Sequence, residues 1–102
     1  MTKSQVEVAA AIMRDQGGKF WGYRLMKETG VRSGVLYPVL DRMLDEGWLI
    51  DGWEDQETAR RKHVRRRYYE LTDKGKRDLG ALLATARTDA RFRSLDLRWA
   101  MP

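Results

Sequence analysis

The first half of the chain carries apolar residues at helical spacing, which predicts three helices joined by short connections. In the first helix, Ser4 and Glu7 fit a capping box, with Ser4 at the N-cap and Glu7 reaching back to it. Gly17-Gly18 ends this helix after about three turns. Its apolar stripe consists of Val6, Ala9, Ala10 and Met13.

The second and third helices are separated by a very short connection. Leu25 and Met26 are the apolar positions of the second helix, which ends at Gly30. After only two intervening residues, Ser33 is a candidate N-cap of the third helix. The pair therefore has the spacing of a helix-turn-helix.

The third helix is the best-patterned segment and ends at Gly47. Its buried stripe repeats at i, i+4, i+7 and i+8, and comprises Leu36, Leu40, Met43 and Leu44. Pro38 suits a first turn but interrupts a helix interior. The helix therefore begins a residue or two after Ser33, or its first turn is irregular. The opposite face carries Val35, Tyr37, Pro38, Asp41 and Arg42.

Residues 48–54 and 64–71 are rich in aromatic and branched side chains and predict two strands. The polar residues 55–63 between them show no apolar period, so the strands form a hairpin with a long charged tip. Alternation along the second strand places Arg65, Arg67 and Tyr69 on one face, and Arg66 and Tyr68 on the other. One of these faces must turn away from any partner, toward acids such as Glu54, Asp55 or Glu57.

A last helix begins at Thr72, an N-cap followed by Asp73 in the positively polarised first turn. We expect it to run to about residue 98, a length of roughly 35–40 Å at 1.5 Å per residue. Its apolar face comprises Leu79, Leu82, Leu83, Ala86 and Ala90, and continues with Phe92, Leu95 and Trp99. The fold class is therefore mainly α with a small β-hairpin: a winged helix-turn-helix of three helices and a two-stranded wing, followed by a long C-terminal helix.

Composition limits the function classes. The 102 residues are enough for one domain, and 42% apolar residues can form one core. The chain has no cysteine, which excludes disulfides, thiolate metal sites and cysteine nucleophiles. No run approaches the roughly 18 apolar residues of a membrane span, so we expect no membrane partner and a cytoplasmic location.

Catalytic and metal-binding motifs are equally scarce. His63 is the single histidine, and neither a Gly-rich phosphate loop nor a nucleophile–base pair is present. We therefore expect no enzyme activity, no metal and no cofactor. We interpret Trp21, Trp48 and Trp53 as core and hairpin packing residues.

The charge is concentrated in one place. The chain has 20 Lys and Arg against 15 Asp and Glu, a net charge of +5, and residues 60–67 alone carry +6. The rest of the chain therefore sums to −1. Such a local cluster predicts a surface for a polyanion, although a solvated basic loop without a partner gives the same pattern.

Four segments resemble the PadR family of bacterial transcriptional regulators. They are residues 22–25 (Gly-Tyr-Arg-Leu), 33–40 (Ser-Gly-Val-Leu-Tyr-Pro-Val-Leu), 44–49 (Leu-Asp-Glu-Gly-Trp-Leu) and 66–75 (Arg-Arg-Tyr-Tyr-Glu-Leu-Thr-Asp-Lys-Gly). The resemblance covers roughly residues 5 to 80, and its Leu-Tyr-Pro and Tyr-Tyr-x-Leu-Thr-x-x-Gly pieces are specific. Trp21, Val35 and Trp48 depart from the usual family residues, which bears on sequence preference.

The resemblance implies a homodimeric repressor that binds double-stranded DNA at a pseudo-palindromic operator. It implies a winged helix-turn-helix over residues 1–72 and a dimerisation helix over residues 73–102, in a single compact unit. A small aromatic effector at the dimer interface is a candidate partner, since some relatives bind one. The implied interface residues are Val6, Ala9, Ala10, Met13, Leu79, Leu82, Leu83, Ala86, Phe92, Leu95 and Trp99.

The third helix also has a physical case for binding DNA. Its N-terminal amides form an anion site, and Arg32 and Arg42 can pair with phosphates or guanine edges. Tyr37 can donate to a phosphate, although half-buried packing between helices is the alternative, and Arg42 can instead pair with an acid on its own helix. The candidate DNA-binding residues are Arg32, Ser33, Gly34, Val35, Tyr37, Pro38 and Arg42, with Arg60, Arg61, Lys62, His63, Arg65 and Arg66 of the hairpin.

Two other functions fit the same pattern. A winged-helix interaction module would bind an acidic protein through the basic patch, and an architectural or RNA-binding protein would use the patch without sequence preference.

Overall fold

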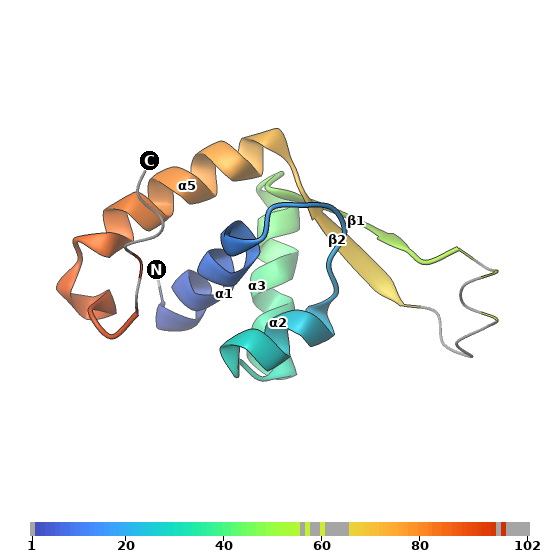
Figure 1. The fold of residues 1–102 in the computed structure, drawn as a ribbon, viewed down its shortest axis with the longest axis horizontal. Coiled ribbons are helices and arrows are strands. Elements are labelled where there is room, and N and C mark those ends of the chain that lie inside the picture. The colour runs from blue at the N-terminus through green and yellow to red at the C-terminus, as the bar shows by residue number, and fades with distance from the viewer. Residues whose placement is uncertain (1, 56, 58–59, 61–65, 96, 98–102) are drawn as a thin grey trace.

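The computed structural model describes residues 2–55, 57, 60, 66–95 and 97. In chain order the elements are α1 (Lys3–Arg14), α2 (Gly22–Thr29), α3 (Ser33–Asp45), β1 (Leu49–Trp53), β2 (Arg67–Leu71), α5 (Asp73–Arg87) and the 3₁₀ turn η1 (Ala90–Phe92). The helices pack together, and the antiparallel hairpin of β1 and β2 projects from them (Figure 1). This is the predicted class, mainly helical with a two-stranded wing.

α1 begins two residues earlier than its predicted start. Thr2 rather than Ser4 is the N-cap: its hydroxyl accepts from the Gln5 amide at 3.1 Å, and the Gln5 side-chain oxygen accepts from the Thr2 amide at 2.9 Å. The capping box therefore exists, but as Thr-x-x-Gln rather than Ser-x-x-Glu. Glu7 lies instead 4.0 Å from the Lys3 ammonium, as an i,i+4 ion pair on the helix surface.

The turn between α2 and α3 is the predicted one. Gly30 has a φ of 73° and donates its N–H to the Met26 carbonyl, so a left-handed glycine ends α2. The Thr29 hydroxyl donates to the Leu25 carbonyl at 2.6 Å and accepts from the Val31 amide at 3.1 Å. These bonds hold the chain in the sharp reversal that a helix-turn-helix requires.

α3 begins directly at Ser33, so Ser33 is its first residue rather than its cap, and a later start is wrong. The Val35 and Leu36 amides both donate to the Arg32 carbonyl, at 3.0 and 2.8 Å, which tightens the first turn. Pro38 stands inside the helix. Since it has no N–H, it leaves the carbonyl one turn earlier without the usual helical donor.

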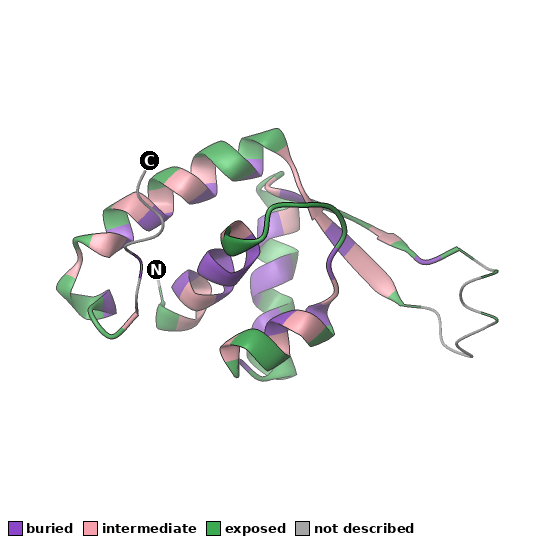
Figure 2. Ribbon diagram, viewed as in Figure 1, coloured by how far each residue is buried: buried purple, intermediate pink, exposed green. Residues whose placement is uncertain are grey.

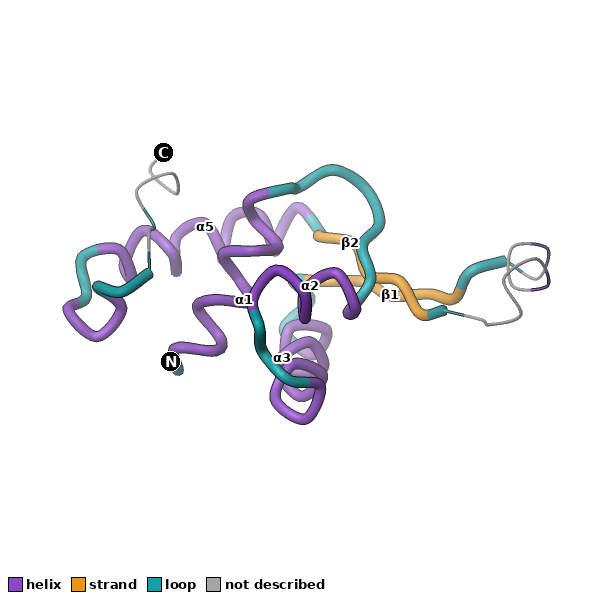
Figure 3. Tube along the Cα trace, turned by 60° about the horizontal axis from the view of Figure 1, so that its bottom comes forward, coloured by secondary structure: helices purple, strands orange, loops and turns teal. Residues whose placement is uncertain are grey.

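The hairpin pairs Leu49 with Leu71 at its base and Trp53 with Arg67 at the far end. A third piece of extended chain joins it, which the sequence pattern did not predict. Phe20, in the α1–α2 loop, exchanges both backbone hydrogen bonds with Tyr69, at 2.9 and 2.8 Å. The loop therefore runs beside β2 and ties α2 to the base of the wing (Figure 3).

α5 is shorter than predicted. Thr72 is the N-cap, as expected, but the helix ends at Arg87 rather than near residue 98. The Thr88 hydroxyl donates to the Thr85 carbonyl, and Asp89 caps the following turn by accepting from the Arg91 amide at 2.9 Å. Side-chain bonds of this kind compete with continuation of a helix.

The core lies where α1 meets α2, α3 and α5, and α1 is its most buried element (Figure 2). Because α5 packs along α1 of the same chain, most side chains predicted for a dimer interface are already buried. Met13, Leu82 and Leu95 remain half-buried, and Trp99 lies outside the described residues. The buried members are Val6, Ala9, Ala10, Leu79, Leu83, Ala86 and Phe92.

A joint of close contacts connects the end of α3 to the start of α5. We call it the α3–α5 joint; it comprises Glu46, Gly47 and Trp48 on one side and Thr72, Lys74, Gly75 and Asp78 on the other. The Thr72 hydroxyl donates to the Gly47 carbonyl at 2.7 Å, and the Thr72 amide donates to the Trp48 carbonyl at 3.0 Å. The Trp48 indole donates to the Asp78 carboxylate at 2.9 Å, and the Lys74 ammonium to the Glu46 carbonyl at 2.6 Å.

In the ranges that the structure describes, no helix has both the length and the apolar character needed to cross a bilayer.

Candidate nucleic-acid interface

The N-terminal half of α3 presents a small, neutral and exposed surface. Val35 is 47% exposed and Tyr37 is 38% exposed, although both are apolar or aromatic. Their neighbours Ser33, Gly34 and Pro38 are also exposed, while Leu36 and Leu40 on the opposite side are fully buried. The helix therefore offers its first two turns and its positively polarised N-terminus to a partner.

The C-terminal half of the same surface is acidic. Asp41 and Asp45 are exposed one and two turns beyond Tyr37. These carboxylates would repel backbone phosphates, so they confine contact with nucleic acid to the first half of α3. The change from neutral to acidic residues along this face is visible in the sequence from the helical spacing of Tyr37, Asp41 and Asp45.

Tyr37 packs against the start of α2 while it stays partly exposed. A Cβ at Gly22 would lie 2.6 Å from the Tyr37 hydroxyl, so only glycine leaves room for the tyrosine there. The Gly-Tyr segment at 22–23 and the Leu-Tyr-Pro segment at 36–38 therefore meet in space. The Tyr37 side chain therefore packs against α2 while 38% of it stays exposed, and its contact with a phosphate stays a prediction.

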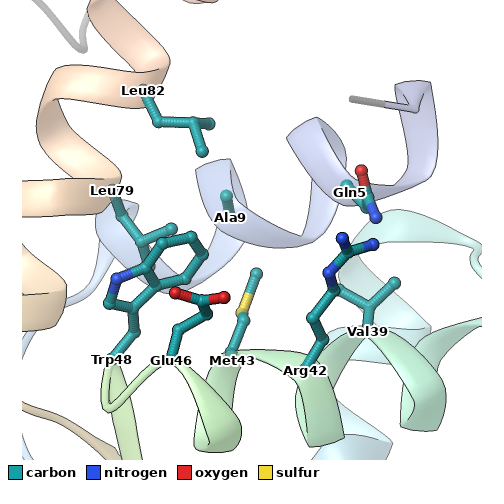
Figure 4. Close-up of a pocket in the computed structure, with 9 residues that line it drawn as sticks. All are labelled: Gln5, Ala9, Val39, Arg42, Met43, Glu46, Trp48, Leu79 and Leu82. Atoms are coloured by element: carbon teal, nitrogen blue, oxygen red, sulfur yellow. The ribbon is translucent and has the colours of Figure 1, made fainter.

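Arg42 lies apart from the Tyr37 surface. Its side chain extends from α3 toward Gln5 of α1, in a pocket of about 300 Å³ between α1, α3 and α5 (Figure 4). We call this the α1–α3–α5 pocket; it is lined by Gln5, Ala9, Val39, Arg42, Met43, Glu46, Trp48, Leu79 and Leu82. Arg42 and Arg32 are both exposed, but Arg32 lies at the N-cap of α3, whereas the Arg42 side chain is directed toward α1.

The base of the wing brings cations close to Tyr37. Arg66 is exposed, and together with Arg67 it lines a cavity that Tyr37 also lines. Arg60 is exposed as well. Four other predicted wing residues, Arg61, Lys62, His63 and Arg65, lie outside the described residues.

Arg67 forms an ion pair with Asp51, which was not among the acids predicted to face the wing cations. Its Nε donates to Asp51 at 2.7 Å, and its Nη2 pairs with the same carboxylate, which raises the pKa of the guanidinium. The guanidinium also lies 5.2 Å from the centre of the Tyr69 ring. Burial raises the pKa of the Tyr69 hydroxyl, so that phenol stays neutral. Arg67 and Tyr69 share the inner face of the wing, as the strand alternation predicted.

Two large apolar side chains of β1 are exposed. Trp53 and Ile50 are each 55% exposed, so Trp53, which pairs with Arg67 at the far end of the hairpin, lies outside the core. Trp21 and Trp48 are half-buried, as expected of packing residues.

Comparison with known proteins agrees with this geometry. Residues 12–81 match the model of the transcriptional regulator PadR-like family. A PadR family transcriptional regulator from Eggerthella lenta DSM 2243 has a similar fold, with a TM-score of 0.60, 24% identity, and coverage of 76% of this chain and 69% of that one. A PadR family transcription regulator from Clostridium difficile R20291 gives a TM-score of 0.63, 22% identity, and coverage of 78% and 86%.

None of the curated proteins compared with the chain matches it. The family match nevertheless spans more than half of the sequence, and it confirms the resemblance carried by the Leu-Tyr-Pro and Tyr-Tyr-x-Leu-Thr-x-x-Gly segments. The chain therefore belongs to the PadR-like family of DNA-binding transcriptional regulators.

Proposed function

We propose that the protein is a homodimeric, sequence-specific repressor that binds a pseudo-palindromic operator in duplex DNA. The observation that carries the proposal is the exposed N-terminal half of α3, flanked by Arg32 and by Arg66 at the base of the wing. A helix with a small, uncharged leading surface can enter the major groove, and the flanking guanidinium groups can pair with the phosphates on either side. Val35 supplies an apolar contact that suits a thymine methyl group.

The dimer follows from the two-fold geometry of such operators. Two copies of α3 must meet major grooves about 34 Å apart, one turn of B-DNA. We propose that α1 and α5 of the two protomers meet, with Met13, Leu82 and Leu95 as the apolar side chains still partly exposed. Sedimentation at micromolar concentration should give the mass of two chains of 11.9 kDa each. The mass of a single chain would contradict the dimer.

A small aromatic effector has a candidate site in the α1–α3–α5 pocket. Its volume of about 300 Å³ is at the lower end of ligand sites, and Trp48, Met43 and Leu82 supply apolar walls beside the polar groups of Gln5 and Arg42. Because α3 forms one wall, a bound ligand would bear directly on the recognition helix. A titration of Trp fluorescence with aromatic acids and amines tests this, and a response unaltered by Met43→Ala would place any ligand elsewhere.

The first experiment is selection from a random duplex library at near-physiological salt, followed by sequencing. Recovery of a pseudo-palindrome with half-sites one turn apart supports the proposal. Recovery of unenriched DNA favours an architectural role through phosphate contacts alone. Failure to recover any DNA favours a protein-interaction module. Repression is then tested by placing the selected site over a reporter promoter, where activation would contradict it.

We also propose binding without catalysis, and a cytoplasmic location. Both follow from membership of a transcriptional regulator family, since such proteins act at genomic DNA.

A further inference from the structure

A cavity of about 330 Å³ lies where the start of α2, the side of α3 and the base of β2 meet. We call it the junction pocket; it is lined by Trp21, Gly22, Tyr23, Tyr37, Arg66 and Arg67. We propose that the junction pocket binds one backbone phosphodiester of the duplex and fixes the angle at which α3 enters the groove. This inference rests on the proposed function and joins two residues already considered for DNA contact, Tyr37 and Arg66, with other lining residues in one phosphate site.

The lining supplies hydrogen-bond donors and no carboxylate. Arg67 uses its Nε and Nη2 for Asp51, which leaves the Nη1 hydrogens of its guanidinium for another acceptor. Arg66 is exposed at the same wall. The Tyr37 hydroxyl lies directly against the start of α2, as the space at Gly22 shows. Two guanidinium groups and a phenol around one opening suit a phosphate oxygen.

The start of α2 adds backbone donors. The first intrahelical bonds run from the Arg24 and Leu25 amides to the Trp21 carbonyl, and no side chain caps the helix. The amides of Gly22 and Tyr23 therefore sit at the positive end of the helix, beside the cavity. Gly22 is buried, and the absence of a side chain there lets the Tyr37 hydroxyl lie directly against this end of the backbone.

Two buried polar atoms in this region have no hydrogen-bond partner among the residues that the structure describes. The Tyr69 side chain is fully buried, and its hydroxyl makes no hydrogen bond. Tyr69 does not line the pocket itself, but the guanidinium of Arg67, a lining residue, lies 5.2 Å from the centre of its ring. The indole N–H of Trp21, a lining residue, is buried and unpartnered as well. Buried polar groups are normally satisfied, so the Trp21 indole N–H, which belongs to a lining residue, is a donor that a polar ligand could satisfy.

The charge balance favours a phosphodiester over other phosphates. Arg66 and Arg67 carry two positive charges, and the Asp51 carboxylate paired with Arg67 cancels one of them. The net single charge matches a backbone phosphodiester, which carries one negative charge, better than a terminal phosphate, which carries nearly two. The pocket also lies between α3 and the base of the wing, the two elements that we propose to contact DNA.

The test is a double-mutant cycle on the intact protein with a duplex that the wild type binds. Arg66→Gln should weaken binding roughly tenfold and lower the slope of log affinity against log salt by about 0.9, the value for one phosphate contact. Tyr37→Phe keeps the ring and the charge, so it should weaken binding without changing the slope. The double variant should lose less than the product of the two single losses, because both groups bind the same phosphate.

Arg93→Gln is the matched control, because Arg93 is an exposed arginine beyond α5, at the other end of the chain. Combined with Tyr37→Phe, it should show no coupling. Independent effects of Arg66→Gln and Tyr37→Phe, or an unchanged salt slope in a protein that still binds DNA, would overturn the pocket and leave the proposed function standing. Absence of any duplex binding by the wild type would overturn both. Urea unfolding of each variant separates a binding loss from a folding loss.

Discussion

Because α5 closely approaches the end of α3, we expect alanine substitutions at two glycines of α5 to have opposite effects on stability. A Cβ at Gly75 would overlap the Trp48 carbonyl oxygen and press on a Leu71 methyl. A Cβ at Gly80 would meet only the terminal methyl of Met13, at an ordinary 3.7 Å. Neither glycine has a positive φ, so alanine is acceptable to the backbone at both positions. The substitution Gly→Ala therefore tests packing alone.

The two substitutions should change the free energy of unfolding in opposite directions. In a helix interior, alanine is more favourable than glycine by about 0.8–1 kcal/mol, and Gly80→Ala should gain most of that. Gly75→Ala gains the same propensity but overpacks against backbone, which costs about 1–3 kcal/mol or more. Relief by outward movement of α5 would weaken the bond from the Thr72 amide to the Trp48 carbonyl, 3.0 Å long, for about another 1 kcal/mol. We expect Gly75→Ala to lower the free energy of unfolding by about 1–3 kcal/mol.

The assay is urea unfolding followed by tryptophan fluorescence and circular dichroism at one fixed protein concentration, since a dimer's stability depends on concentration. With a slope near 1 kcal/mol per molar urea, the Gly75→Ala midpoint should fall by roughly 1–3 M, while that of Gly80→Ala rises by less than about 1 M. A Gly75→Ala protein as stable as the wild type would refute the backbone contact at the α3–α5 joint. Destabilisation by Gly80→Ala would refute the open space at that position.

Three further predictions concern a cap, a pH dependence and the wing tip. Thr72→Ala should lower the free energy of unfolding in urea by about 1–2 kcal/mol, because it removes the cap on the Gly75 amide and the bond to the Gly47 carbonyl. Thr72→Ser should retain most of both bonds, so equal losses in the two variants would contradict this. Hydrogen bonds from the Arg91 guanidinium and amide lower the pKa of Asp89, so its contribution to stability is present above the ordinary carboxyl range and is lost as pH falls through the lowered value. Asp89→Ala should therefore flatten the acid side of the melting-temperature profile, and an unchanged profile would argue against the turn. Alanine at Arg60, Arg61 and Lys62 together should reduce the salt slope of DNA binding by up to about 0.9 per residue and weaken all sequences alike, and an unchanged slope would remove the tip from the interface.

The helices were predictable from the sequence because their signals are local. Gly30 and Thr72 mark ends of helices through their own backbone and side-chain preferences, and both act as predicted. The alternation of Arg67 and Tyr69 likewise followed from strand geometry alone. By contrast, the bridge between Phe20 and Tyr69 joins segments far apart in sequence, and no local pattern predicts it.

The end of α5 was missed although a local signal was present. Thr88-Asp89 repeats the Thr72-Asp73 pair that was correctly interpreted as a helix start, and in the structure Asp89 caps the next turn. The apolar spacing of Phe92 and Leu95 suggested a continuous helix, because an apolar face continues equally well when the chain folds back onto α1. Periodicity therefore identified the buried residues of this segment and not its path.

The candidate site was only partly accessible from sequence. Exposed positions on α3 follow from helical phase, so Val35, Tyr37 and Pro38 were named correctly as a surface. The path of the Arg42 side chain toward Gln5 depends on how α1 crosses α3, which residue spacing does not determine. The junction pocket similarly requires three separate elements to meet.

Through the α3–α5 joint, a change in the orientation of α5 would tilt α3 about a pivot at its C-terminal end. α3 has 13 residues and is therefore about 20 Å long, with the joint at one end and the exposed first turn, proposed to contact DNA, at the other. A tilt of about 10° at the pivot would displace that far turn by roughly 3 Å, close to the 3.4 Å rise of one base step. In the dimer that we propose, small changes in how the two α5 helices cross would therefore change the half-site spacing by about one base pair.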